Sequence, residues 1–258
     1  MARSRLFRAT ALHQLMPPLN SARDHAVQRM FDRIAGRYDL LNRVISFSLD
    51  TRWRNQAIRA ILSGDHATIL DLGTGTGDLA FAAARTGAAR IVGLDFSFPM
   101  LRLAQQKRRE TPCGERAHFV LGSALEPPFK NSVFDGVMTA FVLRNVSDLS
   151  GFFAHAFRVL KPGGKFVSLD MFPPSKNWFS IFYSLYFYGI VPRIGGVLAG
   201  DRNAYRYLSE SVRQFYPPEK VASLIEGAGF KRVTVRKFLS GAVCMHMAEK
   251  PDGPAEVR

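Results

Sequence analysis

The spacing of apolar residues predicts helices that alternate with strands along most of the chain. Apolar side chains recur at helical spacing over 27–38, over 53–62 and over 149–160, and we expect the last of these helices to stop at the Lys-Pro-Gly-Gly sequence of 161–164. Five short apolar runs predict strands, at residues 68–72, 90–95, 118–121, 133–141 and 165–170. Strands that alternate with helices indicate a parallel sheet with helices on both faces.

The C-terminal part of the chain adds an antiparallel pair. A helical stripe over 221–228 ends at Gly229, and two further strands are predicted at 232–238 and 242–249. Only residues 239–241 separate these two strands, so we expect a hairpin whose second strand lies at the edge of the sheet. The predicted fold class is therefore α/β, with a mostly parallel seven-stranded sheet, a C-terminal antiparallel hairpin and added helices.

The chain shows no internal repeat and no low-complexity linker, so we expect one domain over 27–258 after a basic N-terminal arm, 1–26. Within it, 27–64 forms an N-terminal helical section, and 172–215 is an insertion rich in aromatic and basic residues. The apolar run over 177–192 has sixteen uncharged residues, interrupted by Gly and Pro. A spanning helix needs roughly 20 residues, so we predict no membrane-spanning segment.

Composition and charge narrow the class of partner. The chain has 258 residues, of which 47% are hydrophobic, which suffices for a buried core. Its net charge of +14 points to nucleic acid or an anionic membrane surface. Cys113 and Cys244 cannot form a disulfide framework and have no metal-ligand spacing, so we predict a reducing compartment and no metal. Residues 1–23 are rich in Arg and free of acids; we favour a basic arm of a bacterial protein over an organellar targeting peptide.

The first predicted strand runs into a glycine turn, Gly73-x-Gly75-x-Gly77, and then into a helix. Glycines let a ligand approach the backbone closely, and a helix N-terminus presents free amides. The spacing differs from the G-x-G-x-x-G of dinucleotide folds. Asp95 follows Gly77 by 18 residues at the end of the next strand. A carboxylate there either binds a ribose diol or caps the following helix beside Ser97.

These motifs resemble a known group of enzymes. Residues 71–78 together with Asp95 resemble the S-adenosylmethionine-binding core of Rossmann-like class I methyltransferases. Four segments are similar to the ubiquinone/menaquinone biosynthesis methyltransferase family, at 31–42 (FDRIAGRYDLLN), 141–146 (FVLRNV), 158–164 (RVLKPGG) and 200–213 (GDRNAYRYLSESVR). The similarity runs from about Val27 to Glu249.

The resemblance implies which residues contact S-adenosylmethionine. They are Asp71, Gly73, Gly75, Thr76, Gly77, Asp95, Ser123 and Ala124. Thr76 and the glycines would lie against the methionine part, Asp95 would bind the ribose hydroxyls, and Asp71 would face the α-ammonium. Ser123 and Ala124 would border the adenine. Four residues depart from those usual in the family and bear on the substrate: Asp50, Ala140, Asp170 and Phe172.

Methylation of a ring carbon sets the remaining requirements. A sulfonium methyl is already activated, so the enzyme must mainly align the nucleophile. A cation near the developing phenolate and a base for its proton lower the barrier. Arg144 is our candidate for the cation, with a structural ion pair as the alternative; His246 is our candidate for the base, with a structural histidine as the alternative. Tyr38 and Asn42 belong either to a lid over the cofactor or to the core.

The resemblance implies a polyprenylated quinol as substrate, with demethylmenaquinol favoured over the benzoquinol of ubiquinone synthesis. Such a substrate lives in the bilayer, so 172–215 would supply an apolar tunnel or a membrane-facing surface, or else a core or homodimer contact. We expect a cytoplasmic protein attached peripherally to the inner face of an anionic membrane.

Two other functions are open at this point. The net charge suggests an RNA methyltransferase, but the chain lacks the Asn/Asp-Pro-Pro-Tyr/Phe tetrapeptide of amino-methylating enzymes and any RNA-reading motif, so we expect no nucleic acid partner. Ser123 and Ala140 suggest a membrane scaffold that has lost cofactor binding, although the intact glycine turn and Asp95 argue against this alternative.

Overall fold

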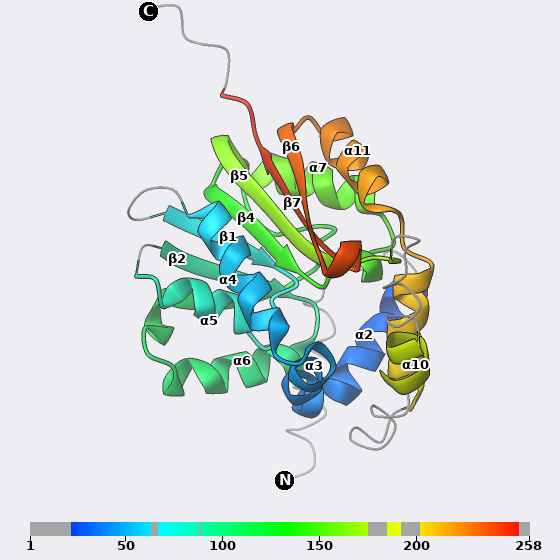
Figure 1. Ribbon diagram of the computed structural model, residues 1–258. Helices are drawn as coiled ribbons and strands as arrows, with labels where there is room; N and C mark the ends of the chain where they lie inside the picture. The colour runs from blue at the N-terminus through cyan, green and yellow to red at the C-terminus, as the bar shows by residue number, and fades with distance from the viewer. Residues whose placement is uncertain (1–21, 63–66, 88, 175–184, 192–201, 253–258) are drawn as a thin grey trace, which may run out of the picture.

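The computed structural model describes residues 22–62, 67–87, 89–174, 185–191 and 202–252. Seven strands form one sheet in the order β3-β2-β1-β4-β5-β7-β6 (Figure 1). They are β1 (Ala67–Leu72), β2 (Ala89–Asp95), β3 (Ala117–Leu121), β4 (Phe134–Ala140), β5 (Leu160–Met171), β6 (Lys231–Phe238) and β7 (Val243–Glu249). Strands β1 to β5 pair in parallel, and β7 is antiparallel to both β5 and β6. The predicted mostly parallel seven-stranded sheet with a C-terminal hairpin is confirmed.

Helices cover both faces of the sheet and gather at one end of it. They are α2 (Ala22–Ile34), α3 (Tyr38–Ser46), α4 (Leu49–Ile61), α5 (Asp78–Ala84), α6 (Phe98–Glu110), α7 (Leu149–Val159), α10 (Arg202–Arg213) and α11 (Pro218–Gly227). Helices α4 and α5 pack on one face, and α7 and α11 pack on the other. Helices α2, α3 and α10 lie beside the carboxyl ends of the parallel strands (Figure 1).

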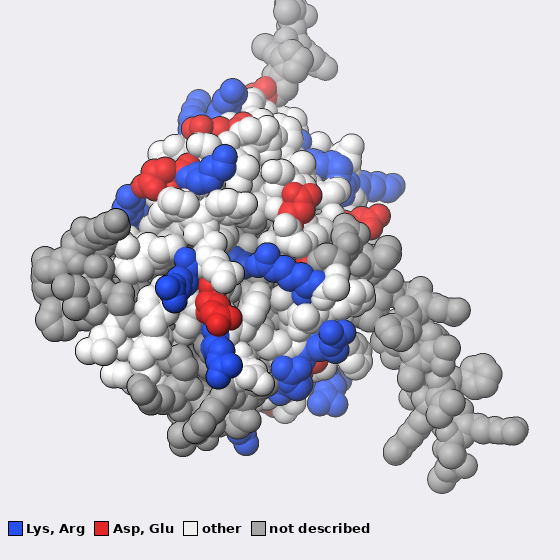
Figure 2. Space-filling view, turned by 90° about the vertical axis from the view of Figure 1, so that its right-hand side faces the viewer, with Lys and Arg blue, Asp and Glu red and all other residues white. Residues whose placement is uncertain are grey.

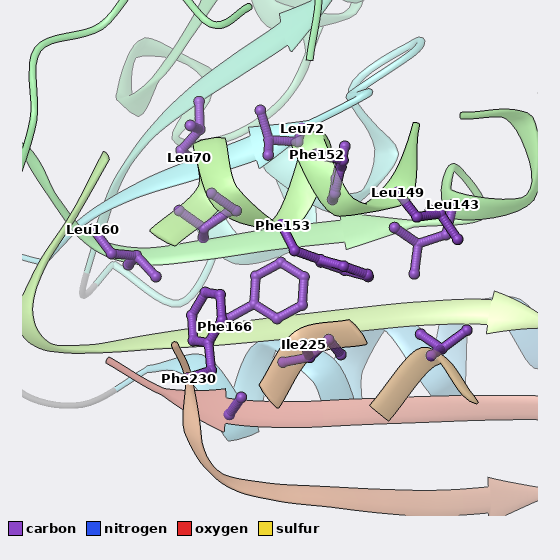
Figure 3. Packing of buried hydrophobic residues seen from close by; sticks show 14 of the residues in the cluster. Leu70, Leu72, Leu143, Leu149, Phe152, Phe153, Leu160, Phe166, Ile225 and Phe230 are labelled. Carbon is purple, nitrogen blue, oxygen red and sulfur yellow. The ribbon is translucent and has the colours of Figure 1, made fainter. Parts of the chain in front are cut away.

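The face under α7 and α11 holds a core rich in phenylalanine. Phe152 and Phe153 of α7 lie beside Phe166 of β5, and Ile225 of α11 and Phe230 complete the layer (Figure 3). All five side chains are almost completely buried. Each contributes about 2–3 kcal/mol of hydrophobic stabilisation, which makes the sheet a rigid base for the groups at its carboxyl end.

A third hydrophobic cluster joins the N-terminal helices to the described part of the 172–215 insertion. Met30 and Leu41 from the N-terminal helices pack with Phe187 of the π-helical turn Leu185–Ile190, with Val191 directly after it and with Val212 of α10. The predicted N-terminal helical section and the described part of the 172–215 insertion therefore form one layer beside the sheet. Most of the aromatic run lies outside the described residues, including Trp178, Phe179, Phe182, Tyr183 and the flanking Lys176 and Arg193. Among the described helices, none is both long enough and apolar enough to cross a bilayer.

Two predicted boundaries are wrong. The helix over 27–38 is broken by a 3-10 turn, Ala35–Arg37, which contains Gly36, a residue of low helix propensity. The helix before the Lys-Pro-Gly-Gly sequence of 161–164 stops at Val159, as predicted, but the strand β5 begins at Leu160 and not at 165, so this sequence is part of the strand. There Gly163 adopts a φ of +72° and its N–H donates to the carbonyl of Lys250, so the sequence forms an irregular strand entry.

The predicted position of the last strand is also wrong. Strand β7 lies between β5 and β6, and β6 is the edge strand. The pattern of side chains explains this order, because β7 is buried along most of its length whereas β6 alternates between exposed and half-buried positions. His246 of β7 is consequently inside the sheet and not at its edge.

Candidate functional site

The glycine turn between β1 and α5 exposes its backbone at one point. Gly73, Gly75 and Gly77 all have positive φ angles, of 72°, 57° and 85°. A Cβ on Gly73 would lie 2.4 Å from Cγ2 of Val142, whereas a Cβ on Gly75 would meet nothing within 4 Å. A side chain at position 73 would therefore clash with Val142, whereas the space beside Gly75 is open.

Asp95 fixes this turn from the end of β2. One carboxylate oxygen accepts the N–H of Gly75 at 2.7 Å, and the other accepts the N–H of Ser97 at 2.8 Å. Ser97 itself caps α6, because its Oγ accepts the N–H of Met100. Burial raises the pKa of Asp95 to about 6. The carboxylate thus lies at the open point of the turn with lone pairs left for a ligand.

Asp71 lies beneath the turn. Its side chain is almost completely buried and accepts a 2.7 Å hydrogen bond from Oγ1 of Thr74. Burial raises the pKa of Asp71 to about 7. The carboxyl lines none of the pockets described below, so Asp71 is connected to them only through the turn.

Thr76 belongs to a polar cluster that joins four elements. Its Oγ1 donates to Asp39 of α3 at 2.5 Å, and Nζ of Lys107 in α6 lies 2.5 Å from Asp39 and 2.8 Å from Asp78 of α5. Burial raises the pKa of Asp78, but the Lys107 ammonium outweighs it and holds that pKa below its usual range. We call these four residues the Lys107 cluster. It holds α3 against the glycine turn.

Two small pockets of about 50 Å³ each adjoin the turn at the carboxyl ends of the strands. Both are lined by Gly73, Asp95, Phe96, Val142 and Asn145, and we call them together the strand-end groove. The first pocket adds Ser123 and Ala124 with apolar neighbours, and the second adds Gly75 and Tyr38. Five of the eight predicted cofactor residues line the groove: Gly73, Gly75, Asp95, Ser123 and Ala124. Thr76 and Gly77 belong to the turn and Asp71 lies beneath it, and none of these three lines the groove.

A larger cavity of about 310 Å³ lies beside the groove. Its walls are mainly apolar and come from α3, α4, β5, the π-helical turn, α10 and the β6–β7 tip. Its polar lining residues are Asn42, Ser46, Asp50 and Arg144. Phe141, directly after β4, lines both this cavity and the second pocket of the groove. The two spaces therefore meet at Phe141.

Arg144 forms a buried ion pair at the wall of the large cavity. Its Nη1 lies 2.5 Å from Oδ1 of Asp170, whose side chain is completely buried, and its own backbone N–H donates to Oδ2. Within the described structure the Nε of Arg144 has no hydrogen-bond partner. Arg144, our candidate for the cation, thus lies beside the cavity. The structural ion pair that we gave as the alternative is also present, and it holds the guanidinium in this position.

Phe141 and Arg54 are functional candidates that the sequence did not single out. Phe141 has a φ of +64°, a conformation that costs a non-glycine residue about 1–3 kcal/mol and that recurs at functional sites. The guanidinium carbons of Arg54 and Arg144 lie 5.1 and 5.9 Å from its ring centroid. Arg54 also pairs with Asp50 at 3.5 Å. The sequence feature that could have identified Phe141 is its position at the end of a predicted strand, where ligands bind in parallel sheets.

The structure does not bring His246 to the other predicted site residues. Its ring is completely buried on the α11 side of the sheet, where Nε2 lies 2.9 Å from the carbonyl oxygen of Pro218 and the ring lies beside Phe172. Burial lowers the pKa of His246, which favours the neutral ring. His246 lines none of the three spaces, and this placement favours the structural alternative. Among the described residues, no group of three His, Cys, Asp or Glu side chains is arranged to hold a metal ion.

Comparisons of the sequence with known proteins give a consistent result. A model of the ubiE/COQ5 methyltransferase family matches residues 19–250. A demethylmenaquinone methyltransferase of Thermus thermophilus is 41% identical over 86% of this chain and all of its own length. A ubiquinone/menaquinone biosynthesis C-methyltransferase UbiE of Desulfotalea psychrophila is 40% identical over 87% of this chain and 90% of its own.

Solved structures share the fold at low sequence identity. A phosphoethanolamine N-methyltransferase of Haemonchus contortus, in complex with S-adenosyl-L-methionine, is 19% identical with a TM-score of 0.55 and covers 77% of this chain and 52% of its own. The cyclase SpnF is 18% identical with a TM-score of 0.61 and covers 89% of this chain and 97% of its own. Since one neighbour is a methyltransferase and the other a cyclase, the fold does not by itself determine the reaction.

Proposed function

The chain belongs to the ubiE/COQ5 methyltransferase family, and we propose that it transfers a methyl group from S-adenosylmethionine to a ring carbon of a prenylated quinol. The observation that carries this proposal is the meeting of the strand-end groove and the large apolar cavity at Phe141. A polar cofactor and an apolar acceptor would each find a space of matching chemistry, with their reacting ends at the junction.

The groove residues fit S-adenosylmethionine. The open backbone at Gly75 admits the methionine part, and the Asp95 carboxylate, already oriented by two N–H donors, accepts from a ribose diol. The pocket that contains Ser123 and Ala124 has apolar walls suited to an adenine ring. When bound, S-adenosylmethionine supplies a methyl group already activated on a sulfonium.

The residues of the large cavity prepare the acceptor. Its apolar walls exclude water and orient the ring toward Phe141. The Arg144 guanidinium, fixed by Asp170, stabilises the phenolate that makes the neighbouring ring carbon nucleophilic. Asn42 and Asp50 are the polar groups available to the other ring oxygen.

We propose demethylmenaquinol as the acceptor, following the name of the relative from Thermus thermophilus. The test is incubation of the purified protein with methyl-labelled S-adenosylmethionine and a prenylated naphthoquinol, a prenylated benzoquinol, or RNA. We expect label in the naphthoquinol. Label in RNA, or in neither quinol, would refute the proposal. A polyprenylated substrate further leads us to propose peripheral attachment to the cytoplasmic face of the membrane.

Cofactor binding is expected to release protons. Since the pKa values of Asp71 and Asp95 are raised to about 7 and about 6, both carboxyls keep their protons to a higher pH in the cofactor-free fold than free carboxyls do. Their contribution to the stability of that fold is therefore greatest at low pH and falls as pH rises through these values. An ammonium and two hydroxyl donors favour the ionised forms, so affinity for S-adenosylmethionine should fall at least about tenfold between pH 7.5 and 5.5.

Titration calorimetry at pH 6 in buffers of different ionisation enthalpy measures this release. Asp71→Asn is the matched variant, because it removes one titrating group beneath the turn without touching the groove lining. It should release fewer protons. A dissociation constant independent of pH would contradict the prediction, and absence of binding at every pH would support the scaffold alternative.

A further inference from the structure

The large cavity reaches the molecular surface between apolar tips. Phe47 and Leu239 both line the cavity, yet they are 71% and 37% exposed. Phe47 comes from the α3–α4 connection and Leu239 from the β6–β7 connection, and Tyr186 of the π-helical turn lies between cavity and surface with its ring centroid 5.4 Å from that of Phe47. Leu185, beside Tyr186, is 67% exposed. We call these four residues the cavity rim.

Two connections at the rim have residues with positive φ angles, and both connections carry an exposed apolar side chain. Phe47 and Ser48 have φ angles of 51° and 60°, and Leu239 and Ser240 have φ angles of 45° and 53°. Each such non-glycine residue costs about 1–2 kcal/mol, and glycine would remove that cost. Two connections of this fold therefore hold exposed apolar side chains in conformations that do not favour them. Strain of this kind recurs where a surface has a binding role.

The exposed charges on the three segments that carry the rim are all positive, although Lys237 and Arg232 of β6 pair with Glu219 and Glu249 from other elements. In the described segments 40–61, 185–191 and 231–241, the exposed charged residues are all Arg or Lys, since the one acid there, Asp50, is buried. Arg52 lies in the first turn of α4, just after Phe47, and Arg236 lies just before the β6–β7 tip. Lys and Arg also predominate over the lower part of the face that includes α10 (Figure 2).

We propose that the cavity rim docks on an anionic lipid bilayer, so that the cavity opens into the membrane and receives the quinol ring directly. This inference rests on the proposed function, because the apolar chain of the substrate explains why the opening is apolar. Exposed aromatic and aliphatic side chains enter the interface, and the surrounding arginines contact lipid phosphates. A globular protein partner would need acids facing Arg52 and Arg236, and a second copy of this chain offers no exposed acid at its own rim within the described residues.

The test is co-sedimentation of the full chain with phosphatidylcholine vesicles with and without phosphatidylglycerol. We expect binding that requires the anionic lipid. Arg52→Glu/Arg236→Glu should weaken it at least about tenfold, since each basic residue near the surface contributes about 1 kcal/mol. The matched control is Arg90→Glu/Arg109→Glu, which makes the same charge change at exposed positions on the amino side of the sheet. Leu185→Ser should also weaken binding, whereas Val133→Ser, just before β4 on the amino side of the sheet, should not.

Activity on a short-chain, water-soluble quinol separates the two proposals. All four variants should keep wild-type rates on it, because none of the substituted residues lines the groove or the cavity. If the wild-type protein does not methylate this substrate, the proposed function is refuted, whereas the docking proposal is judged by the vesicle binding. Active protein that fails to bind anionic vesicles, or that binds them equally with both charge variants, would overturn the docking proposal. So would a dimer in solution that Arg52→Glu/Arg236→Glu dissociates.

Discussion

Replacing Arg144 with alanine is expected to lower the rate of methyl transfer by about 10²–10³-fold, the loss typical of removing one group that stabilises developing negative charge. The guanidinium lies at the wall of the large cavity, and no other Lys or Arg lines the three spaces in the described structure. Affinity for S-adenosylmethionine should stay close to wild type, because Arg144 lines neither pocket of the groove.

The same substitution also affects stability, and the ion pair explains how to separate the two effects. Arg144→Ala leaves the completely buried Asp170 carboxylate without its cation, which should reduce the free energy of unfolding by about 3–5 kcal/mol. Arg144→Met/Asp170→Asn removes both charges while the amide oxygen still accepts a backbone N–H, so much of this stability should return. The rate should remain low in the double variant.

Denaturant unfolding, single-turnover methyl transfer and calorimetry with S-adenosylmethionine measure the three quantities. Recovery of stability without recovery of rate would identify Arg144 as catalytic. Parallel recovery of both, or an equal loss of rate and cofactor affinity in Arg144→Ala, would mean that Arg144 is structural.

The second large effect is expected from a pair of glycines in one turn. Gly73→Ala places a Cβ 2.4 Å from Val142 at a φ of +72° and should destabilise the fold by about 3 kcal/mol, because overpacking adds to backbone strain. Gly75→Ala meets no neighbour and should cost only about 1 kcal/mol, or about 3 °C in melting temperature.

The variant with the smaller loss of stability, Gly75→Ala, should show the clear loss of cofactor affinity. Gly75→Ala fills open space in the groove, so a well-folded variant should bind S-adenosylmethionine at least about tenfold more weakly. Thermal unfolding and calorimetry on both variants check this. Unchanged affinity in Gly75→Ala would show that the groove is not the cofactor site.

The local features of the chain were predictable, whereas features made by distant segments were not. Strand ends and the glycine turn follow from short patterns, so the positions of Gly73, Gly75 and Asp95 in the groove were accessible from the sequence. The large cavity was not, because its walls come from α3, the π-helical turn and the β6–β7 tip, which are far apart along the chain. The pairing of Arg144 with Asp170 depends likewise on the turn after β4 lying beside the end of β5.

His246 shows what a more careful interpretation of the pattern would have given. An antiparallel pair is evident from the short connection, but which strand lies inside is decided by burial on both faces. Val243–Glu249 is nearly continuous in apolar residues, while Lys231–Phe238 alternates with charged ones, and this contrast predicts β7 as the inner strand. An inner position makes a histidine a structural residue far more readily than a base.

One helix serves both ligand spaces. Helix α3 contributes Tyr38 to the groove and Asn42 to the large cavity, and the Lys107 cluster fastens it to the glycine turn through Asp39. A displacement of α3 would therefore alter the cofactor space and the acceptor space at the same time. Because the large cavity also has its own opening at the rim, the acceptor can exchange with a bilayer while α3 stays in place over the cofactor.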